Sequence, residues 1–428
     1  MAGLALLGCV DAAQRSDAPP NLVLIVADDH GYTDFGFMGS PHVATPHLDR
    51  LAQEGTLFTR GFNTASVCGP SLRTLLTGQH PYQWDHHVAR MHRRGVRRAR
   101  GEEIQDFGTL PRWLQGRGYA SFQGGKFWEA SYAVAGFTHG MQRFGDDIAW
   151  GGSSTHLGRT TMEPLYAFID AHRAQPFLVW FTPKLPHVPH DAAAEYRKPY
   201  QGLGFSDDAV RYYANITRLD AVVGELLAHL EGLGLRERTL VVFLTDNGWD
   251  QGPHAERRQT MDGPRGKRSM YELGFRTPIV FHGPGRVPAG AVHDELVSTV
   301  DLVPTLLDYA GAAIPDALPG RSLRPWIEGT GPWTRNTVIG GRMQTAEGGS
   351  NPDLSATDWR RSTFFVRSDR WHYIWDVETG DDVLFDMERD PQQQHDVVSE
   401  HPVLAPLFRD VIRRWQTEMA RGVEIEPD

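Results

Sequence analysis

Continuous apolar runs, in which polar residues do not alternate with hydrophobic ones, recur along the first two thirds of the chain. The longest are residues 21–27, 176–181 and 239–245, and shorter ones occur at 56–59 and 120–122. Such runs are typical of strands that are buried on both faces of a parallel sheet. They therefore predict the central strands of an α/β domain.

Helical patterns fill the stretches between these strands. Thr45 and Pro46 form a cap and a first helical position, and another helix is expected to begin near Pro70. Residues 110–118 form a short amphipathic pattern, and 208–233 repeat apolar residues at helical spacing. The alternation predicts an α/β fold with a large, mostly parallel central sheet that is flanked by helices.

Residues after about 330 follow a different pattern. Short strand-like runs lie close together at 364–366, 372–375 and 383–385, and residues 403–419 have helical spacing. They predict a small C-terminal antiparallel sheet with a helix packed on it. We therefore divide the chain into an N-terminal segment, an α/β domain and a smaller α+β subdomain, with bounds at 1–20, 21–330 and 331–428.

The N-terminal segment resembles an export signal. Residues 4–9 are mostly apolar and end in Gly8 and Cys9, as at a bacterial lipoprotein cleavage site, although the usual basic start is missing. This pattern predicts a bacterial protein that is periplasmic or exported, with a lipid anchor as one option. A disordered tail is the alternative. No apolar run reaches about 18 residues, so we expect no transmembrane helix.

Composition narrows the function further. The formal net charge is −10, which argues against nucleic acid as a partner. Two cysteines, Cys9 and Cys68, are too few for a disulfide framework or a Cys-rich zinc site. Because the chain otherwise uses arginine, its few lysines are candidates for sites that need a compact positive charge. They are Lys126, Lys184, Lys198 and Lys267.

Two of the predicted strands end in pairs of oxygen-bearing side chains, Asp28–Asp29 and Asp246–Asn247. Ligand sites in open α/β sheets lie at the carboxyl ends of the strands. Hard oxygen donors at two such ends suit Ca²⁺ or Mg²⁺. The alternative is that each pair only forms a turn or caps a helix.

Cys68 stands two residues before Pro70, where a helix is expected to begin. The N-terminus of a helix stabilises negative charge and therefore favours a nucleophilic thiolate. The alternative is a small, inert cysteine in the core.

Several separate blocks resemble, in order, the sulfatase family of the alkaline-phosphatase-like superfamily, from residue 21 to about 396. The blocks are Asp28-Asp29, Cys68-Gly69-Pro70-Ser71 with Thr77-Gly78, Gly125-Lys126, Pro186-His187, Asp246-Asn247-Gly248, Lys267 ahead of Tyr271-Glu272, residues 298–307, and Leu384-Phe385-Asp386 with Asp390-Pro391. Because many blocks match in register, the resemblance implies the fold of that family and the hydrolysis of sulfate esters.

The resemblance also implies roles for single residues. In sulfatases a maturation enzyme oxidises the motif cysteine to formylglycine, whose hydrated aldehyde attacks the sulfur, and Cys68 has that position. Lys126 and Lys267 bind the sulfate and stabilise negative charge in the transition state, and His187 matches the histidine that assists the leaving oxygen. A cation, Ca²⁺ rather than Mg²⁺, is held by Asp28, Asp29, Asp246 and Asn247.

One departure from the family pattern concerns an arginine. The family places it four residues after the cysteine, where this chain has Leu72, and Arg73 follows one position later. One residue rotates a helical side chain by about 100°. Arg73 is therefore a displaced candidate for the arginine that braces the nucleophile. Because the maturation enzyme reads this signature, the change also bears on the conversion of Cys68.

A second departure concerns a histidine. The family has it two residues after the lysine, where this chain has Trp128. That histidine handles a proton when the sulfated intermediate collapses, so another residue is needed. His254 is the first candidate because it follows the Asp246–Asn247 pair, and His86 and His87 are the reserve.

Two further patterns suggest a sulfated carbohydrate as substrate. Six arginines crowd the predicted loop before Leu110 and are interpreted either as a collar for an anionic substrate or as a solvated loop; they are Arg90, Arg93, Arg94, Arg97, Arg98 and Arg100. Aromatic side chains that can stack on sugar rings, or belong to the core, are Trp84, Trp128, Trp150 and Trp249. The alternatives to a sulfatase are a phosphodiesterase or phosphonate monoester hydrolase of the same superfamily, and a non-catalytic anion binder.

Overall fold

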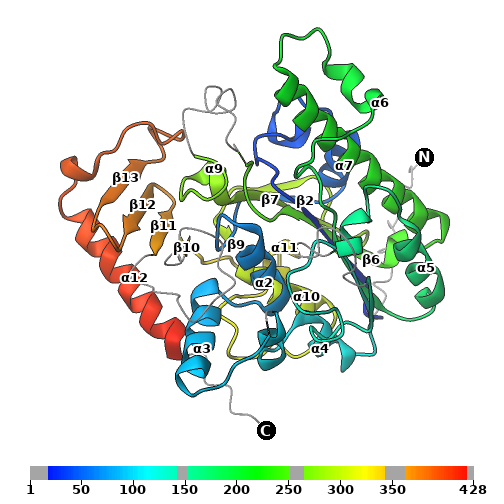
Figure 1. The fold of residues 1–428 in the computed structure, drawn as a ribbon, viewed down its shortest axis with the longest axis horizontal. Coiled ribbons are helices and arrows are strands. Elements are labelled where there is room, and N and C mark those ends of the chain that lie inside the picture. Colours follow the sequence, from blue (N-terminus) through cyan, green and yellow to red (C-terminus); the bar gives the residue numbers. More distant parts are fainter. Residues whose placement is uncertain (1–17, 100, 142–151, 251–264, 343–361, 422–428) are drawn as a thin grey trace, which may run out of the picture.

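A computed structural model describes residues 18–99, 101–141, 152–250, 265–342 and 362–421. A nine-stranded sheet crosses the molecule, and a four-stranded antiparallel sheet lies beside it (Figure 1). The order in the large sheet is β4 (His139–Gly140), β3 (Ala120–Gly125), β5 (Phe177–Thr182), β1 (Asn21–Ala27), β6 (Thr239–Thr245), β7 (Arg276–His282), β2 (Thr56–Phe62) and β8 (Ala291–His293), with β9 (Val297–Ser298) also on β2.

The large sheet is mostly parallel, as predicted. Its only antiparallel pairs among the described strands are those of β7 with β6 and with β2. No strand is predicted at β7, because Pro278 interrupts its apolar pattern.

Helices cover both faces of the large sheet, because alternate side chains of its strands enter two separate cores. In β1, Leu22 and Leu24 belong to one core, and Val23 and Ile25 to the other. The first core is covered by α2 (Cys68–Thr77), α3 (Pro81–Arg93), α4 (Leu110–Gln115), α10 (Leu302–Tyr309) and α11 (Arg324–Ile327). The second is covered by α1 (Pro46–Gln53), α5 (Glu163–His172) and α7 (Asp207–Gly232).

The C-terminal sheet has the order β10 (Thr337–Arg342), β11 (Thr363–Ser368), β12 (Trp371–Asp376) and β13 (Asp382–Asp386). The long helix α12 (Leu404–Arg421) packs on it through Ile412 and Trp415. The predicted antiparallel sheet with a helix is therefore confirmed, whereas the domain bound at 330 stays a prediction. On the other face, Phe365 stacks on Phe275, at the end of the short helix α9 (Glu272–Phe275), with 4.0 Å between ring centroids. Another short helix, α6 (Ala194–Arg197), precedes α7.

The predicted arginine-rich loop is wrong for its first part. Arg90 and Arg93 lie on α3, whose buried face carries Trp84 and Val88. This helix begins with proline at its first turn and has an apolar residue every four positions, a signal that the many arginines obscure. Among the described helices, none is long and apolar enough to cross a membrane.

Candidate active site

The site lies where neighbouring strands of the large sheet end. β3, β5, β1 and β6 are adjacent and parallel, so the residues that follow them meet at one edge. Asp28 and Asp29 follow β1, and Asp246 follows β6. The backbone N–H of Asp29 donates to Oδ1 of Asp246 at 3.1 Å. The sheet register therefore brings the predicted carboxylates together.

Cys68 is the first residue of α2 and is 1% exposed. Its Sγ lies 3.6 Å from Oδ1 of Asp28 and 3.6 Å from Oδ1 of Asp29. Nζ of Lys126 is 3.2 Å from the same sulfur. Burial, and then repulsion by Asp246, raise the pKa of the Cys68 thiol well above its ordinary value, although Lys126 opposes this shift. The unmodified thiol is therefore protonated at neutral pH and is a poor nucleophile.

Lys126 follows β3 and forms a buried ion pair with Asp28. Nζ is 2.7 Å from Oδ1 and 2.8 Å from Oδ2. Burial lowers the pKa of Lys126, but attraction to Asp28, Cys68 and Asp29 together outweighs burial, so the pKa is raised. The preceding Gly125 has φ +98°, and a Cβ there would lie 2.1 Å from the carbonyl oxygen of Thr182. Glycine is thus required for the backbone to turn Lys126 into the site.

Lys267 reaches the same cluster from the segment before α9. Its Nζ lies 2.7 Å from Oδ1 and 2.8 Å from Oδ2 of Asp29, and 3.9 Å from Oδ2 of Asp250. Burial lowers the pKa of Lys267. Attraction to Cys68, Asp29 and Asp28 together has the opposite and larger effect, so the pKa is raised and the ammonium is retained. Burial alone would raise the pKa of Asp29, but Lys267 and His187 hold it below its usual range. Two lysines thus neutralise two of the carboxylates.

The third carboxylate is not neutralised in this way. Burial, and then repulsion by Asp28, raise the pKa of Asp246 well above its ordinary value. Its Oδ2 is buried without a hydrogen-bond partner, and so is Oδ1 of Asn247. The amide of Asn247 is oriented by its Nδ2, which donates to Asp29 at 2.8 Å. Two buried oxygen atoms thus have no donor among the described residues.

These oxygen atoms fit a divalent cation. Asp28, Asp29, Asp246 and Cys68 each offer a ligand atom, and these atoms all lie within 4.8 Å of one another. Carboxylate and amide oxygens are the donors that Ca²⁺ and Mg²⁺ prefer. A cation there would supply the positive charge that the buried carboxylate of Asp246 lacks.

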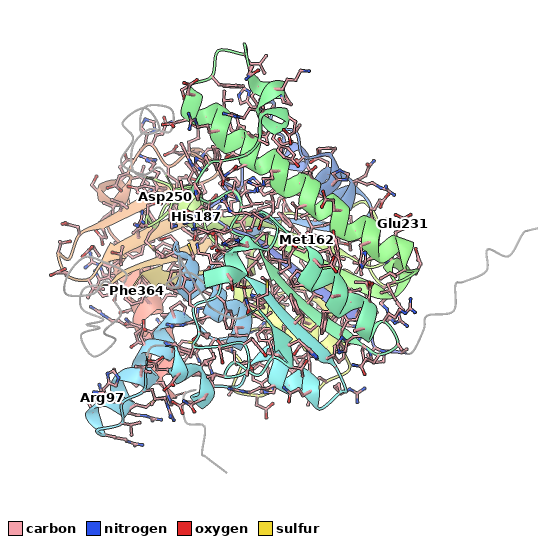
Figure 2. The ribbon with its side chains drawn as sticks, turned by 45° about the vertical axis from the view of Figure 1, so that its right-hand side comes forward. Arg97, Met162, His187, Glu231, Asp250 and Phe364 are labelled. Carbon is pink, nitrogen blue, oxygen red and sulfur yellow. The ribbon has the colours of Figure 1, made fainter. Side chains whose placement is uncertain are left out.

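His187 follows β5 in the next turn of chain and faces the carboxylates. Its Nδ1 donates to the carbonyl oxygen of Val188 at 2.7 Å, and its Nε2 lies 3.5 Å from Oδ2 of Asp29. Burial lowers the pKa of His187 below the ordinary 6.5, although Asp28 and Asp29 oppose this. Figure 2 shows His187 and Asp250 in the same part of the molecule.

Arg159 was missed by sequence reasoning. Its Nη2 donates to the carbonyl oxygen of His187 at 2.5 Å, and its Nε donates to that of Lys184 at 2.8 Å. It therefore fixes the loop that carries His187. No motif surrounds Arg159, and only its distant backbone partners reveal its role.

Arg73 and Trp128 both lie near α2 but make different contacts. Nε of Arg73 donates to Glu129, and no hydrogen bond or ion pair within the described residues joins Arg73 to Cys68. The ring of Trp128 lies against Gly69, where a Cβ would meet it at 3.6 Å, and Nζ of Lys126 is 5.8 Å from the ring centroid. Trp128 therefore lies beside the residue that follows Cys68, whereas Arg73 points to another partner.

The remaining candidates lie elsewhere. His254 and Trp150 are outside the described residues. His86 stacks on Tyr82, and His87 contacts Phe107. Trp84 is buried and stacks on Phe107 with 4.0 Å between centroids, so it belongs to the core and does not offer a surface for a sugar. Trp249 packs against Tyr212 at 5.6 Å.

Comparison with known proteins identifies the family. The sulfatase family matches residues 20–312, and the C-terminal family of N-sulphoglucosamine sulphohydrolase matches residues 263–420. This chain belongs to the sulfatase family. Its reaction class is thus the hydrolysis of sulfuric esters.

Named relatives agree with this assignment. Human arylsulfatase A is 30% identical over 366 residues, which cover 75% of this chain and 70% of the relative. An ulvan-active sulfatase of Formosa agariphila is 26% identical over 428 residues and covers 92% of this chain and 81% of the relative.

Solved structures share the fold. Ps i-CgsB in complex with k-i-k-neocarrahexaose has a TM-score of 0.74 at 23% identity, covering 94% of this chain and 93% of that one. The phosphonate monoester hydrolase of Agrobacterium radiobacter has a TM-score of 0.70 at 18% identity, covering 94% and 96%.

Proposed function

We propose that this sulfatase removes sulfate from a sulfated carbohydrate, with a formylglycine nucleophile derived from Cys68 and a divalent cation, Ca²⁺ in preference to Mg²⁺, beside it. One observation carries the proposal. Cys68, two lysines and the carboxylates of Asp28, Asp29 and Asp246 converge in one buried cluster at the carboxyl edge of the sheet. The raised pKa of the Cys68 thiol also favours a modified nucleophile over the thiolate.

The residues of this chain have separable tasks in that reaction. Lys126 and Lys267 place two fixed ammonium groups beside Cys68, where they attract the sulfate and stabilise the negative charge that develops on its oxygens. Asp28, Asp29, Asp246 and Asn247 would hold the cation, which when bound would supply Lewis-acid polarisation of the sulfate. Formylglycine supplies a hydrated aldehyde as nucleophile. Burial excludes water and strengthens each of these charge interactions.

His187 is proposed to deliver a proton to the leaving alcohol oxygen. Its Nδ1 is committed to the carbonyl oxygen of Val188, so Nε2 is the atom that can carry this proton. The contact of Nε2 with Asp29 favours protonation, and Arg159 keeps the loop in place.

The carbohydrate part of the proposal is supported by the names of relatives. They include N-acetylgalactosamine-6-sulfatases at 29% identity and the ulvan-active sulfatase. In this chain, Trp128 offers an aromatic face beside the residue that follows Cys68, and this face suits the apolar face of a sugar ring. Export to the periplasm, and a maturation enzyme as partner, belong to the same proposal.

The test combines chemistry and activity. Protein from the native organism is digested, and the peptide across Cys68 is examined by mass spectrometry and by labelling with a hydrazide probe. We expect an aldehyde at Cys68 and turnover of an aryl sulfate and a sulfated monosaccharide. An unmodified thiol without turnover would favour the anion binder, and faster turnover of aryl phosphonate or phosphodiester would favour the phosphonate hydrolase.

A further inference from the structure

An arginine-rich segment follows the active-site helix and has no evident task in the reaction. Residues 86–101 contain six arginines and three histidines and no Asp or Glu, in a chain whose net charge is −10. Helix α3 ends at Arg93 within this segment. The C-terminus of a helix carries a partial charge of about −0.5. The helix dipole therefore balances only a small part of this excess of positive charge.

The structure exposes three of these arginines together. Arg93, Arg94 and Arg97 are exposed, and within the described part of the chain no carboxylate pairs with any of them. Arg97 folds back over the helix end, because its Nη1 donates to the carbonyl oxygen of His92 at 2.7 Å. We call Arg93, Arg94 and Arg97 the α3 arginine surface.

Neighbouring acidic groups are already committed. Asp106 pairs with Arg98 through Nε at 2.7 Å. Glu102 accepts from the backbone of Ala99 at 3.1 Å, and Glu103 accepts from that of Gly101 at 2.7 Å. The charge of the α3 arginine surface is therefore available to a ligand.

This surface is separate from the active site. Figure 2 places Arg97 at the lower edge of the molecule, away from His187 and Asp250. Its arginines therefore form no collar around the nucleophile, contrary to one of the interpretations of the sequence. A ligand that touches both places must be long.

We propose that the α3 arginine surface binds a distant stretch of the sulfated polysaccharide whose esters the active site hydrolyses. This inference rests on the proposed function, since it takes the substrate to be a sulfated chain. Such a chain carries repeated anionic groups, and the planar guanidinium group matches an oxyanion with two parallel hydrogen bonds. Binding at a second place raises the effective concentration of esters near Cys68.

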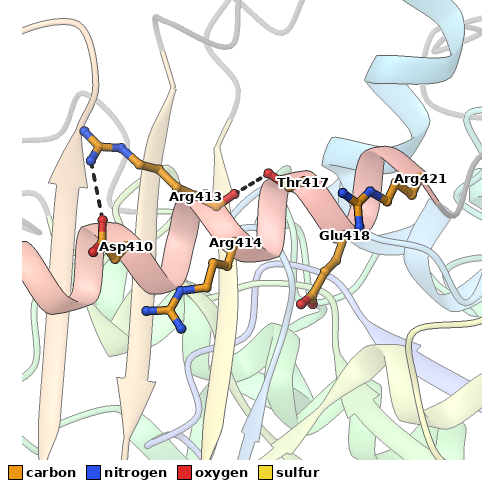
Figure 3. Close-up of a pocket in the computed structure, with 6 residues that line it drawn as sticks. All are labelled: Asp410, Arg413, Arg414, Thr417, Glu418 and Arg421. Atoms are coloured by element: carbon orange, nitrogen blue, oxygen red, sulfur yellow. Dashed lines mark hydrogen bonds and ion pairs between the residues drawn. The ribbon is translucent and has the colours of Figure 1, made fainter.

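Another arginine-bearing surface of this chain provides a control. The outer face of α12 carries Arg413, Arg414 and Arg421 around a shallow hollow (Figure 3). There, Asp410 and Glu418 alternate with the arginines, and Arg413 pairs with Asp410 at 3.6 Å. The same loss of three positive charges can thus be made at a surface where acids balance the arginines.

The test measures binding of the full chain to immobilised dextran sulfate. For Arg93→Ser/Arg94→Ser/Arg97→Ser we expect a dissociation constant about tenfold higher at low salt, since each exposed charge contact contributes about twofold, and the difference should shrink at high salt. For Arg413→Ser/Arg414→Ser/Arg421→Ser we expect a change below about twofold. Equal losses in both triple variants, or no loss in either, would overturn the proposal.

Competing ligands and activity complete the test. Unsulfated dextran should not bind, and duplex DNA or anionic lipid vesicles that bind as tightly as dextran sulfate would also overturn the proposal. The α3 triple variant should keep the wild-type kcat/KM with a small aryl sulfate. With a sulfated polysaccharide its kcat/KM should fall below the wild-type value. If the protein binds dextran sulfate through α3 but has no sulfatase turnover, the proposed function is refuted and the binding surface stands. If it has turnover but no such binding, the binding surface is refuted and the proposed function stands.

Discussion

Nε of Arg73 donates to Oε1 of Glu129 at 2.9 Å, and this contact joins α2 to the loop that carries Trp128. Glu129 is 2% exposed, and the Arg73 guanidinium also lies 4.6 Å above the ring of Trp84. Leu72, at the position of the family arginine, is buried in the core. The two departures from the family pattern are therefore linked in space, because Arg73 binds Glu129, the residue that follows Trp128.

We predict that Arg73 acts on the position of Trp128 and not on the chemical step. Arg73→Met leaves Glu129 buried without this partner, which is expected to lower the free energy of unfolding by roughly 3 kcal/mol. With an aryl sulfate, KM should rise severalfold while kcat changes little, because the ring of Trp128, which we propose faces the substrate, loses its support. Urea denaturation and steady-state kinetics measure the two effects.

The matched control is Arg73→Met/Glu129→Gln, which removes the buried charge together with its partner and should recover most of the lost stability. If Arg73→Met instead lowers kcat more than about tenfold with KM unchanged, Arg73 takes part in the reaction itself, despite its displacement by one residue from the position of the family arginine.

Asp246 should reveal the cation site without any measurement of activity. Asp246→Asn removes the carboxylate whose ionisation burial and Asp28 oppose, so in the presence of EDTA the melting temperature is expected to rise. Added Ca²⁺ should stabilise the wild type by about 2.7 kcal/mol at a hundred times its dissociation constant, and should stabilise Asp246→Asn much less. Differential scanning calorimetry with and without Ca²⁺ gives both values.

Asp250→Asn is the control for that experiment, because Asp250 lies 3.9 Å from Lys267 but is outside the group of possible ligands. An equal response to Ca²⁺ in wild type and Asp246→Asn, or an equal loss in Asp250→Asn, contradicts the assignment of Asp246 as a ligand.

Cys68→Ala and Cys68→Ser should both lose nearly all turnover while they remain folded. The first removes the side chain that becomes the nucleophile, and the second prevents aldehyde formation by a cysteine-specific maturation enzyme. Circular dichroism and the melting temperature check the fold. Full turnover in Cys68→Ala excludes covalent catalysis at this residue.

Acid should weaken the contact between the two sheets through Glu272. Nε of Arg367, on β11, donates to Glu272 at 2.6 Å, and Arg276 donates to it at 2.9 Å. Burial opposes ionisation, but Arg276 and Arg367 lower the pKa of Glu272 from 4.5 to about 2. Because the folded pKa is depressed, this stabilisation is present above pH 4.5 and is lost as pH falls toward 2.

Glu272→Gln tests this window. At about 1.4 kcal/mol for each pH unit, the variant should be roughly 3 kcal/mol less stable than wild type at pH 7, and the difference should fall to less than half of this at pH 3. Urea denaturation between pH 3 and 7 measures it. A difference that stays constant over this range contradicts the role of the ionised carboxylate.

The sequence predicted the part of this molecule that depends on local pattern. β1 and β6 are buried along their whole length, so their apolar runs and the acids that follow them were readable. The family motif located Cys68 and Lys126. Glu129 and Arg159 were not predictable, because their partners lie 56 and 28 residues away and no motif marks such pairs. No strand is predicted at β7, because Pro278 interrupts its apolar pattern, and only the strands on either side show that the segment is a central strand.

The last prediction concerns the proton-transfer group that Trp128 replaces. Trp249 precedes His254 in the sequence and Lys267 follows it, and both lie near the site. The backbone N–H of Lys267 donates to the carbonyl oxygen of Trp249 at 2.8 Å, and Nζ of Lys267 contacts Asp29. His254 follows Trp249 by five positions in the sequence. We therefore keep His254 as the first candidate, ahead of His86 and His87, which contact Tyr82 and Phe107.

His254→Ala should slow the release of sulfate by a factor of roughly 10² to 10⁴. Release of the alcohol should then show a burst of about one equivalent per active site, because the first step does not need this group. Rapid-quench kinetics with an aryl sulfate resolves the two products. Normal turnover in His254→Ala, together with a burst in His86→Ala or His87→Ala, would move the role to that pair. Trp128→His adds a sharper test, since a histidine beside Gly69 should abolish the burst of His254→Ala if proton transfer at that position is what the family histidine provides.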